Sequence, residues 1–256
     1  MIVYGTRDIA PDLVGAPTVD LSLRDEIELR GGEILQVLSE VTFKDFEKRV
    51  PPALHPSHPP FASMVFYVVP ESDYGPFSMA MVRISSLAGI SRFGYAVRAW
   101  IDNPDAGADL GRRFGYRFDP GVVRIQRGYD TVRGTVAAGD RTVLDVGMTD
   151  PQPVAGKDVN FAGHLNIAYV ADGNGEAKPT LIHAGPLLAF SSCDRGKPQV
   201  NTFDSAAIGL DAPYWPISAF TGRCDFKFNP IQFACDPMLP AVDRTMTLAG
   251  SMHTVG

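Results

Sequence analysis

Short apolar segments, each bounded by glycine, proline, asparagine or aspartate, recur along most of this chain. They are rich in β-branched and aromatic residues, as β-strands are, and the residues that bound them are typical of turns. The segments span 62–70, 77–85, 93–103, 141–148, 164–172, 179–185, 187–192 and 223–235. In the last one Cys224, Phe226 and Phe228 alternate with Asp225 and Lys227, the period of two that predicts a half-buried strand.

Helical segments are few. The sequence predicts one over 42–50, where Phe43 and Phe46 share a face and Pro51 ends the helix, and two more near 104–114 and 202–212. We interpret 55–60 as a rigid extended linker and predict turns at 172–179 and 194–197. Many strands and few helices predict one mainly β domain, a barrel or a sandwich, over 31–240, with an N-terminal arm (1–30) and a C-terminal tail (241–256).

Charge and composition exclude several functions. The 256 residues carry a net charge of −6, which argues against binding to nucleic acid or to an anionic membrane surface. The sequence has no apolar run of about 18 residues and no signal-peptide pattern at its start, so we expect a cytoplasmic protein. Cys193, Cys224 and Cys235 lack metal-site spacing and are expected to be buried free thiols. His55 and His58 lack a third ligand, so no metal or cofactor is expected.

Four segments, taken in order, resemble the acetoacetate decarboxylase superfamily. They are VPPAL (50–54), YGPF (74–77), IDNPDAGADLGRRFGYRFDPG (101–121) and YDTVRGTV (129–136). The resemblance covers roughly residues 38–236. It implies a closed, cone-shaped antiparallel β-barrel with a few short helices, an apolar pocket for a small-molecule substrate, and a homo-oligomer.

The resemblance also implies a Schiff-base lysine, and here that position falls on Phe118 or Asp119. The family's pocket arginine falls on about Glu40 and its glutamate near Met79. Arg117 cannot replace the lysine, because a guanidinium stays protonated and is a poor nucleophile. The sequence has only six lysines against seventeen arginines, so we interpret 110–121 as an active-site segment without its lysine.

Several polar residues remain as catalytic candidates. Arg117 and Asp119 are two residues apart and would share a face, either as an oxyanion-binding residue and a base or as a surface ion pair. His164 and His183 lie in predicted strands and suit proton transfer, although a lone histidine in a strand is more often a structural residue. Glu40 would become a general acid or base if it were buried, and is otherwise a charged residue before the first helix.

Candidate binding residues accompany them. Arg98 lies in an apolar strand and needs a partner if it is buried, either a substrate anion or a carboxylate such as Asp102 or Glu40. The other candidate binding residues are Trp100, Met79, Tyr116, Phe118 and Asn166.

These features predict a cofactor-independent enzyme that works by acid/base catalysis on a keto or polyketide-like metabolite. Cyclisation, aldol-type dehydration and isomerisation would all fit. One alternative is decarboxylation of a β-keto acid without an imine. The other is a protein that binds an apolar metabolite without catalysis.

Overall fold

The computed structural model describes residues 4–23, 25–159, 161–171, 175–231 and 233–241. Its helices are α1 (Ala10–Leu13), α2 (Phe43–Arg49), α3 (Pro104–Phe114) and α4 (Ser205–Ile208), with one 3₁₀ turn, η1 (Gly156–Asp158). The strands are β1 (Thr18–Val19), β2 (Ile27–Glu40), β3 (His55–Pro56), β4 (Phe61–Val69), β5 (Phe77–Ala88), β6 (Ser91–Ile101), β7 (Asp119–Pro120), β8 (Val122–Arg127), β9 (Thr131–Ala138), β10 (Arg141–Pro153), β11 (Gly163–Ala171), β12 (Ala177–Ala184), β13 (Pro186–Phe203), β14 (Trp215–Phe228) and β15 (Phe233–Cys235).

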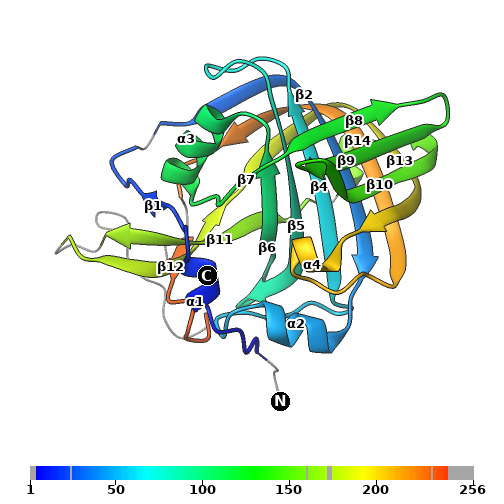
Figure 1. Ribbon diagram of the computed structural model, residues 1–256. Helices are drawn as coiled ribbons and strands as arrows, with labels where there is room; N and C mark the ends of the chain where they lie inside the picture. The colour runs from blue at the N-terminus through cyan, green and yellow to red at the C-terminus, as the bar shows by residue number, and fades with distance from the viewer. Residues whose placement is uncertain (1–3, 24, 160, 172–174, 232, 242–256) are drawn as a thin grey trace.

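All the strands belong to one strongly curled sheet (Figure 1). Its hydrogen-bonded order is β15-β12-β11-β6-β5-β4-β2-β14-β13-β10-β9-β8. Most neighbours are antiparallel, whereas β11 runs parallel to both β6 and β1, and β7 runs parallel to β6. The sheet is therefore mixed.

The expected closure of the barrel is not seen in the described residues. The curl brings β8 against β4, β5 and β6, yet the only backbone pairing of β8 is with β9. The contact is made by side chains, such as the buried Val123 of β8. The observed architecture is thus mainly β, with one large curled sheet and a few short helices.

The central strands are buried on both faces. On β4, Met64 and Phe66 pack into one core cluster, which includes β8–β10, α2 and α4. Val65 and Tyr67 pack into a second cluster on the opposite face, which includes α3 and the end of β14. Burial on both faces explains why this strand is an almost unbroken apolar run rather than an alternating one.

Several predicted elements are confirmed. The predicted helices at 42–50 and 104–114 correspond to α2 and α3, and the predicted strands overlap β4, β5, β6 and β10–β14. Cys224, Phe226 and Phe228 are buried while Asp225 is exposed, as the alternation in β14 predicted. All three cysteines are buried and free.

Other predictions are corrected by the pairing of the strands. The turn expected at 194–197 lies within β13, which is paired on both sides, with β10 and β14. Of the turn expected at 172–179, residues 172–174 lie outside the described residues, and 177–179 belong to β12. The helix near 202–212 is only the single turn of α4. Within the part of the chain described here, no helix has the length and apolarity needed to cross a membrane.

Candidate functional site

The end of helix α3 positions the segment that the sequence singled out. Asn103 caps the start of the helix, and its side chain accepts hydrogen bonds from the amides of Asp105 and Ala106. It ends at Gly115, which has a φ of 69°. A Cβ at Gly115 would lie 2.5 Å from Ile182 Cδ1, so glycine also permits close packing against β12. The chain then turns through residues 116–119 along the edge of β6.

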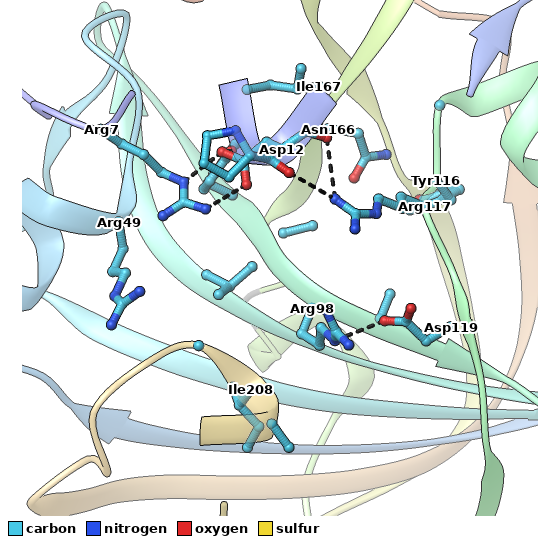
Figure 2. Close-up of a pocket in the computed structure, with 18 of the residues that line it drawn as sticks. Arg7, Asp12, Arg49, Arg98, Tyr116, Arg117, Asp119, Asn166, Ile167 and Ile208 are labelled. Carbon is cyan, nitrogen blue, oxygen red and sulfur yellow. Dashed lines mark hydrogen bonds and ion pairs between the residues drawn. The ribbon is translucent and has the colours of Figure 1, made fainter. Parts of the chain in front are cut away.

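A polar cavity of about 260 Å³ lies beside this segment, and we call it the arginine pocket (Figure 2). Its charged lining residues are Arg7, Asp12, Arg49, Arg98, Arg117 and Asp119. Tyr95, Tyr116, Asn166 and Ile208 are among its other lining residues. The charged side chains come from the N-terminal arm, α2, β6 and the 116–119 segment, which are far apart in the sequence.

The N-terminal arm contributes an ion pair to one wall. Arg7 Nε donates to Asp12 Oδ2 at 2.5 Å and Arg7 Nη2 donates to Asp12 Oδ1 at 2.6 Å, a bidentate arrangement. The hydrogen bonding of Arg7 to the Asp12 carboxylate raises the pKa of Arg7 above its ordinary value. The buried Tyr95 hydroxyl also donates to Asp12, at 3.3 Å.

The other three arginines keep donors for a ligand. Arg98 Nε lies 2.7 Å from Asp119 Oδ2 but lacks hydrogen-bond geometry, so the pair is held mainly by charge. Arg117 donates to the backbone oxygens of Pro11 and Asp12, at 3.3 Å each. Arg49 points into the same space and has no hydrogen-bond or ion-pair partner among the described residues (Figure 2).

The formal charge of the pocket is positive. Four arginines against two aspartates leave +2 in a molecule whose net charge is −6. Positive charge gathered in a small cavity attracts anions, and arginine binds carboxylates with two parallel hydrogen bonds. The arrangement suits a small carboxylate.

A buried chain of hydrogen bonds starts at Tyr116. The Tyr116 hydroxyl lies 2.6 Å from His164 Nδ1, and the Tyr67 hydroxyl lies 3.0 Å from His164 Nε2. All three side chains are buried. Tyr116 is also 3.4 Å from the Ala184 carbonyl oxygen, whereas His164 is the only acceptor the structure gives the Tyr67 hydroxyl among the described residues.

This difference in acceptors determines which atom donates each hydrogen bond of the chain. Tyr67 donates to His164 Nε2, His164 Nδ1–H donates to Tyr116, and Tyr116 donates to Ala184, so that each proton has an acceptor. Burial lowers the pKa of His164 well below its ordinary value, and the nearby Arg83 lowers it further. The imidazole is therefore neutral at physiological pH.

The structure thus brings five of the predicted site residues together. Arg98, Tyr116, Arg117, Asp119 and Asn166 line the arginine pocket. Arg117 and Asp119 do not pair with each other, and the partner of Arg98 is Asp119 rather than Asp102 or Glu40. Asn166 donates to the Phe114 carbonyl oxygen at 3.1 Å, which ties β11 to the end of α3.

The remaining predicted residues lie elsewhere. Glu40, at the end of β2, accepts a hydrogen bond from Tyr214 at 2.9 Å. His183 is half-buried beside the Phe93 ring, and burial lowers its pKa. Trp100 and Met79 are core residues, one in each cluster. Phe118 stacks on Tyr116 and lines a second, more apolar groove beside α3, which shares Tyr116, Arg117 and Asp119 with the arginine pocket.

Lysine does not line the arginine pocket. Lys227 pairs with Glu26 at 2.6 Å. The other five lysines are exposed: Lys44, Lys48, Lys157, Lys178 and Lys197. His55 Nε2 lies 2.9 Å from the Gly89 carbonyl oxygen. The described residues contain no group of three or more His, Cys, Asp or Glu side chains placed to hold a metal.

Sequence analysis missed Arg7, Asp12, Arg49, Arg83 and Tyr67. A signal existed for Arg83, because it interrupts the apolar run FSMAMVRIS, and the argument used for Arg98 applies to it equally. Arg49 sits at the end of a short amphipathic helix, where a solvated arginine is ordinary, so nothing local distinguished it.

Comparison with solved structures identifies the architecture. An acetoacetate decarboxylase structure matches with a TM-score of 0.72 and 15% identity, over 88% of this chain and 97% of that chain. The acetoacetate decarboxylase of Legionella pneumophila matches with a TM-score of 0.68 and 12% identity, over 80% and 85%. The enduracididine biosynthesis enzyme MppR complexed with pyruvate matches with a TM-score of 0.64 and 14% identity, over 81% and 88%.

No protein-family model matches the sequence, and no curated protein sequence matches it significantly. The structural matches show that the chain has the acetoacetate decarboxylase-like fold. Because their sequence identities are only 12–15%, they establish the fold alone.

Proposed function

We propose that this chain, which has the acetoacetate decarboxylase-like fold, is a small-molecule enzyme that binds a keto-bearing carboxylate in the arginine pocket and moves a proton on it without forming an imine. The observation that carries the proposal is the position of Asp119 in that pocket, next to Arg98 and in the same cavity as Arg49, which has no partner among the described residues. One of the similar structures is a complex with pyruvate, which is a molecule of this class.

The pocket supplies the groups that such a reaction needs. Arg49 and Arg117 would hold the substrate carboxylate, because both direct donors at the cavity. Arg98 would bind the carbonyl oxygen and stabilise the negative charge that develops there as an enolate forms. A substrate oxygen bound to Arg98 would take it from Asp119, leaving that carboxylate free to accept a proton from the carbon next to the carbonyl.

Imine chemistry is not part of the proposal, because Phe118 and Asp119 occupy the expected lysine position and no lysine lines the pocket. Treatment with pyruvate or acetoacetate and then borohydride should leave the intact mass of the protein unchanged. A covalent adduct would contradict this part of the proposal.

Proton transfer can be measured directly by exchange. In D₂O the protein should speed the incorporation of deuterium at the methyl group of pyruvate. The loss of the methyl signal in ¹H NMR spectra measures this exchange. Asp119→Asn should slow this exchange by about 100-fold or more, the usual contribution of a general base. Acetone formed from acetoacetate in the same assay would report decarboxylation. Binding of pyruvate without any exchange would identify a binding protein instead.

Arg49 offers a test of substrate binding. Arg49→Gln should raise the KM for exchange by about tenfold, the cost of one charge-assisted contact, and change kcat less. Arg124→Gln is a matched control, since Arg124 is exposed on β8 and lies outside the arginine pocket. Equal effects of the two variants would show that Arg49 does not bind the substrate.

A further inference from the structure

Arg83 is a buried cation without a carboxylate. It lies on β5 and is only 1% exposed. Its guanidinium donates to the Ala162 carbonyl oxygen at 2.9 Å, to Ser63 Oγ at 2.9 Å and to Gln36 Oε1 at 3.1 Å. No Asp or Glu pairs with it among the described residues, and an unpaired buried charge is costly.

The surroundings are shaped to hold this arginine. Gly94 faces it from β6, and a Cβ there would lie 3.0 Å from both Cδ and Nε of Arg83. The guanidinium carbon lies 4.8 Å from the centre of the Phe161 ring, within the range of a cation–π contact. These contacts fix the side chain in place but supply no negative charge.

Hydrogen-bond donors outnumber acceptors around it. Among the described residues the five N–H groups of the guanidinium have three acceptors, and the buried Nε has no partner. Among the described residues the structure gives no acceptor to the Ser63 hydroxyl proton or to the Gln36 amide nitrogen, and both residues are 3% exposed. A ligand group with several hydrogen-bond acceptors would satisfy these donors.

A cavity of about 580 Å³ adjoins these donors, and we call it the Arg83 cavity. Its polar part consists of Gln36, Ser63, Arg83 and Ser85, and its apolar wall includes Leu38, Phe61, Phe93 and Phe161. Arg92, which is exposed, also lines it, whereas no acidic residue does. The Arg83 cavity shares no lining residue with the arginine pocket.

We propose that the Arg83 cavity is a second anion site, which binds a monocarboxylate with an apolar or aromatic body. The carboxylate accepts from Arg83, Ser63 and Gln36, and the body packs against the phenylalanine rings. This site is independent of the function proposed above, because it is built from different residues.

Isothermal titration with small probes tests the chemistry on the unmodified protein. Benzoate should bind at least about tenfold more tightly than benzamide, which has the same shape without the charge, since a charge-assisted bond is worth about 1.5–3 kcal/mol. Benzoate should also bind more tightly than acetate, which lacks the apolar body. Equal affinities for benzoate and benzamide would overturn the proposal.

Variants then locate the site. Arg83→Met should weaken benzoate binding by at least about tenfold, and Ser63→Ala should weaken it by a smaller factor. Arg49→Gln, in the arginine pocket, should leave benzoate affinity unchanged while it weakens pyruvate binding. If Arg83→Met does not fold, Ser63→Ala and Arg49→Gln still decide between the two cavities. Loss of benzoate binding in Arg49→Gln, with full binding in Ser63→Ala, would place the ligand in the arginine pocket and refute the inference.

Discussion

The buried His164 illustrates how a single residue links stability to pH. Because burial lowers its pKa in the folded state, the unfolded state takes up a proton more readily. The stabilisation is fully present above the ordinary histidine pKa near 6.5 and is lost as the pH falls below it. The lowered pKa of His183 acts in the same direction.

We therefore expect the free energy of unfolding to decrease as the pH falls from 7 to 5, with a slope for His164 alone that steepens below pH 6.5 to at most about 1.4 kcal/mol per pH unit. Urea unfolding at several pH values measures this dependence. His164→Gln should make the free energy of unfolding depend less steeply on pH. Aspartates with lowered pKa values, such as Asp145, lose their contribution only at more acidic pH, below their ordinary value of 3.8. An unchanged slope in His164→Gln would show that this histidine is not the source.

The hydrogen bond from Tyr67 to His164 can be tested by removing one hydroxyl. Tyr67→Phe leaves His164 Nε2 buried without a donor, which should cost about 1–3 kcal/mol of the free energy of unfolding. Tyr214→Phe is the matched control, because that hydroxyl donates to Glu40 at the surface and its loss should cost no more than about 0.5 kcal/mol. Similar costs in the two variants would contradict the buried chain.

At the scale of elements, the end of α3 decides where the site residues lie. Gly115 combines a positive φ of 69° with tight packing, since a Cβ there would lie 2.5 Å from Ile182 Cδ1 and 2.8 Å from Ala168 Cβ. Gly139 has a similar φ of 60° but no atom within 4 Å of its Cβ position. The two positions share a positive φ, which would strain an alanine at either one, and they differ in packing.

Gly115→Ala should consequently be less stable than Gly139→Ala by about 1–3 kcal/mol, the usual cost of overpacking. Thermal or urea unfolding of both variants measures the difference. Gly115→Ala should also weaken pyruvate binding, because a shift at residue 115 moves Arg117 and Asp119. Equal stabilities would show that the contact with β12 is loose.

At the scale of the whole molecule, the sheet curls without completing its hydrogen-bond ladder. β4 is paired on both sides, with β2 and β5, whereas within the described part of the chain β8 is paired only with β9. Backbone amides on the unpaired edge of β8 should therefore exchange with solvent faster than those of β4. Hydrogen exchange followed by mass spectrometry measures this, and equal protection of 122–127 and 61–69 would indicate a barrel that is closed in solution.

The sequence by itself determined much of the local structure. Period-two alternation predicted the buried side chains of β14, and the segment at 104–114, which begins after Asn103 and ends at Gly115, corresponds to α3. These features follow from local hydrogen bonding and side-chain burial, which depend on near neighbours in the chain. The sequence alone also showed that Phe118 and Asp119 stand where the resemblance implied a lysine.

Strand pairing and the two cavities were decided only by the tertiary structure. β2 went unpredicted because its glycine pair, Gly31 and Gly32, interrupts the apolar pattern, and the polar half of β13 became a strand because it has a partner on each side. Arg7, Arg49 and Arg98 meet because the arm, α2 and β6 pack together. Contacts between residues so far apart in the chain leave no periodic pattern in the sequence, so the arginine pocket and the Arg83 cavity emerge only when the sheet has curled.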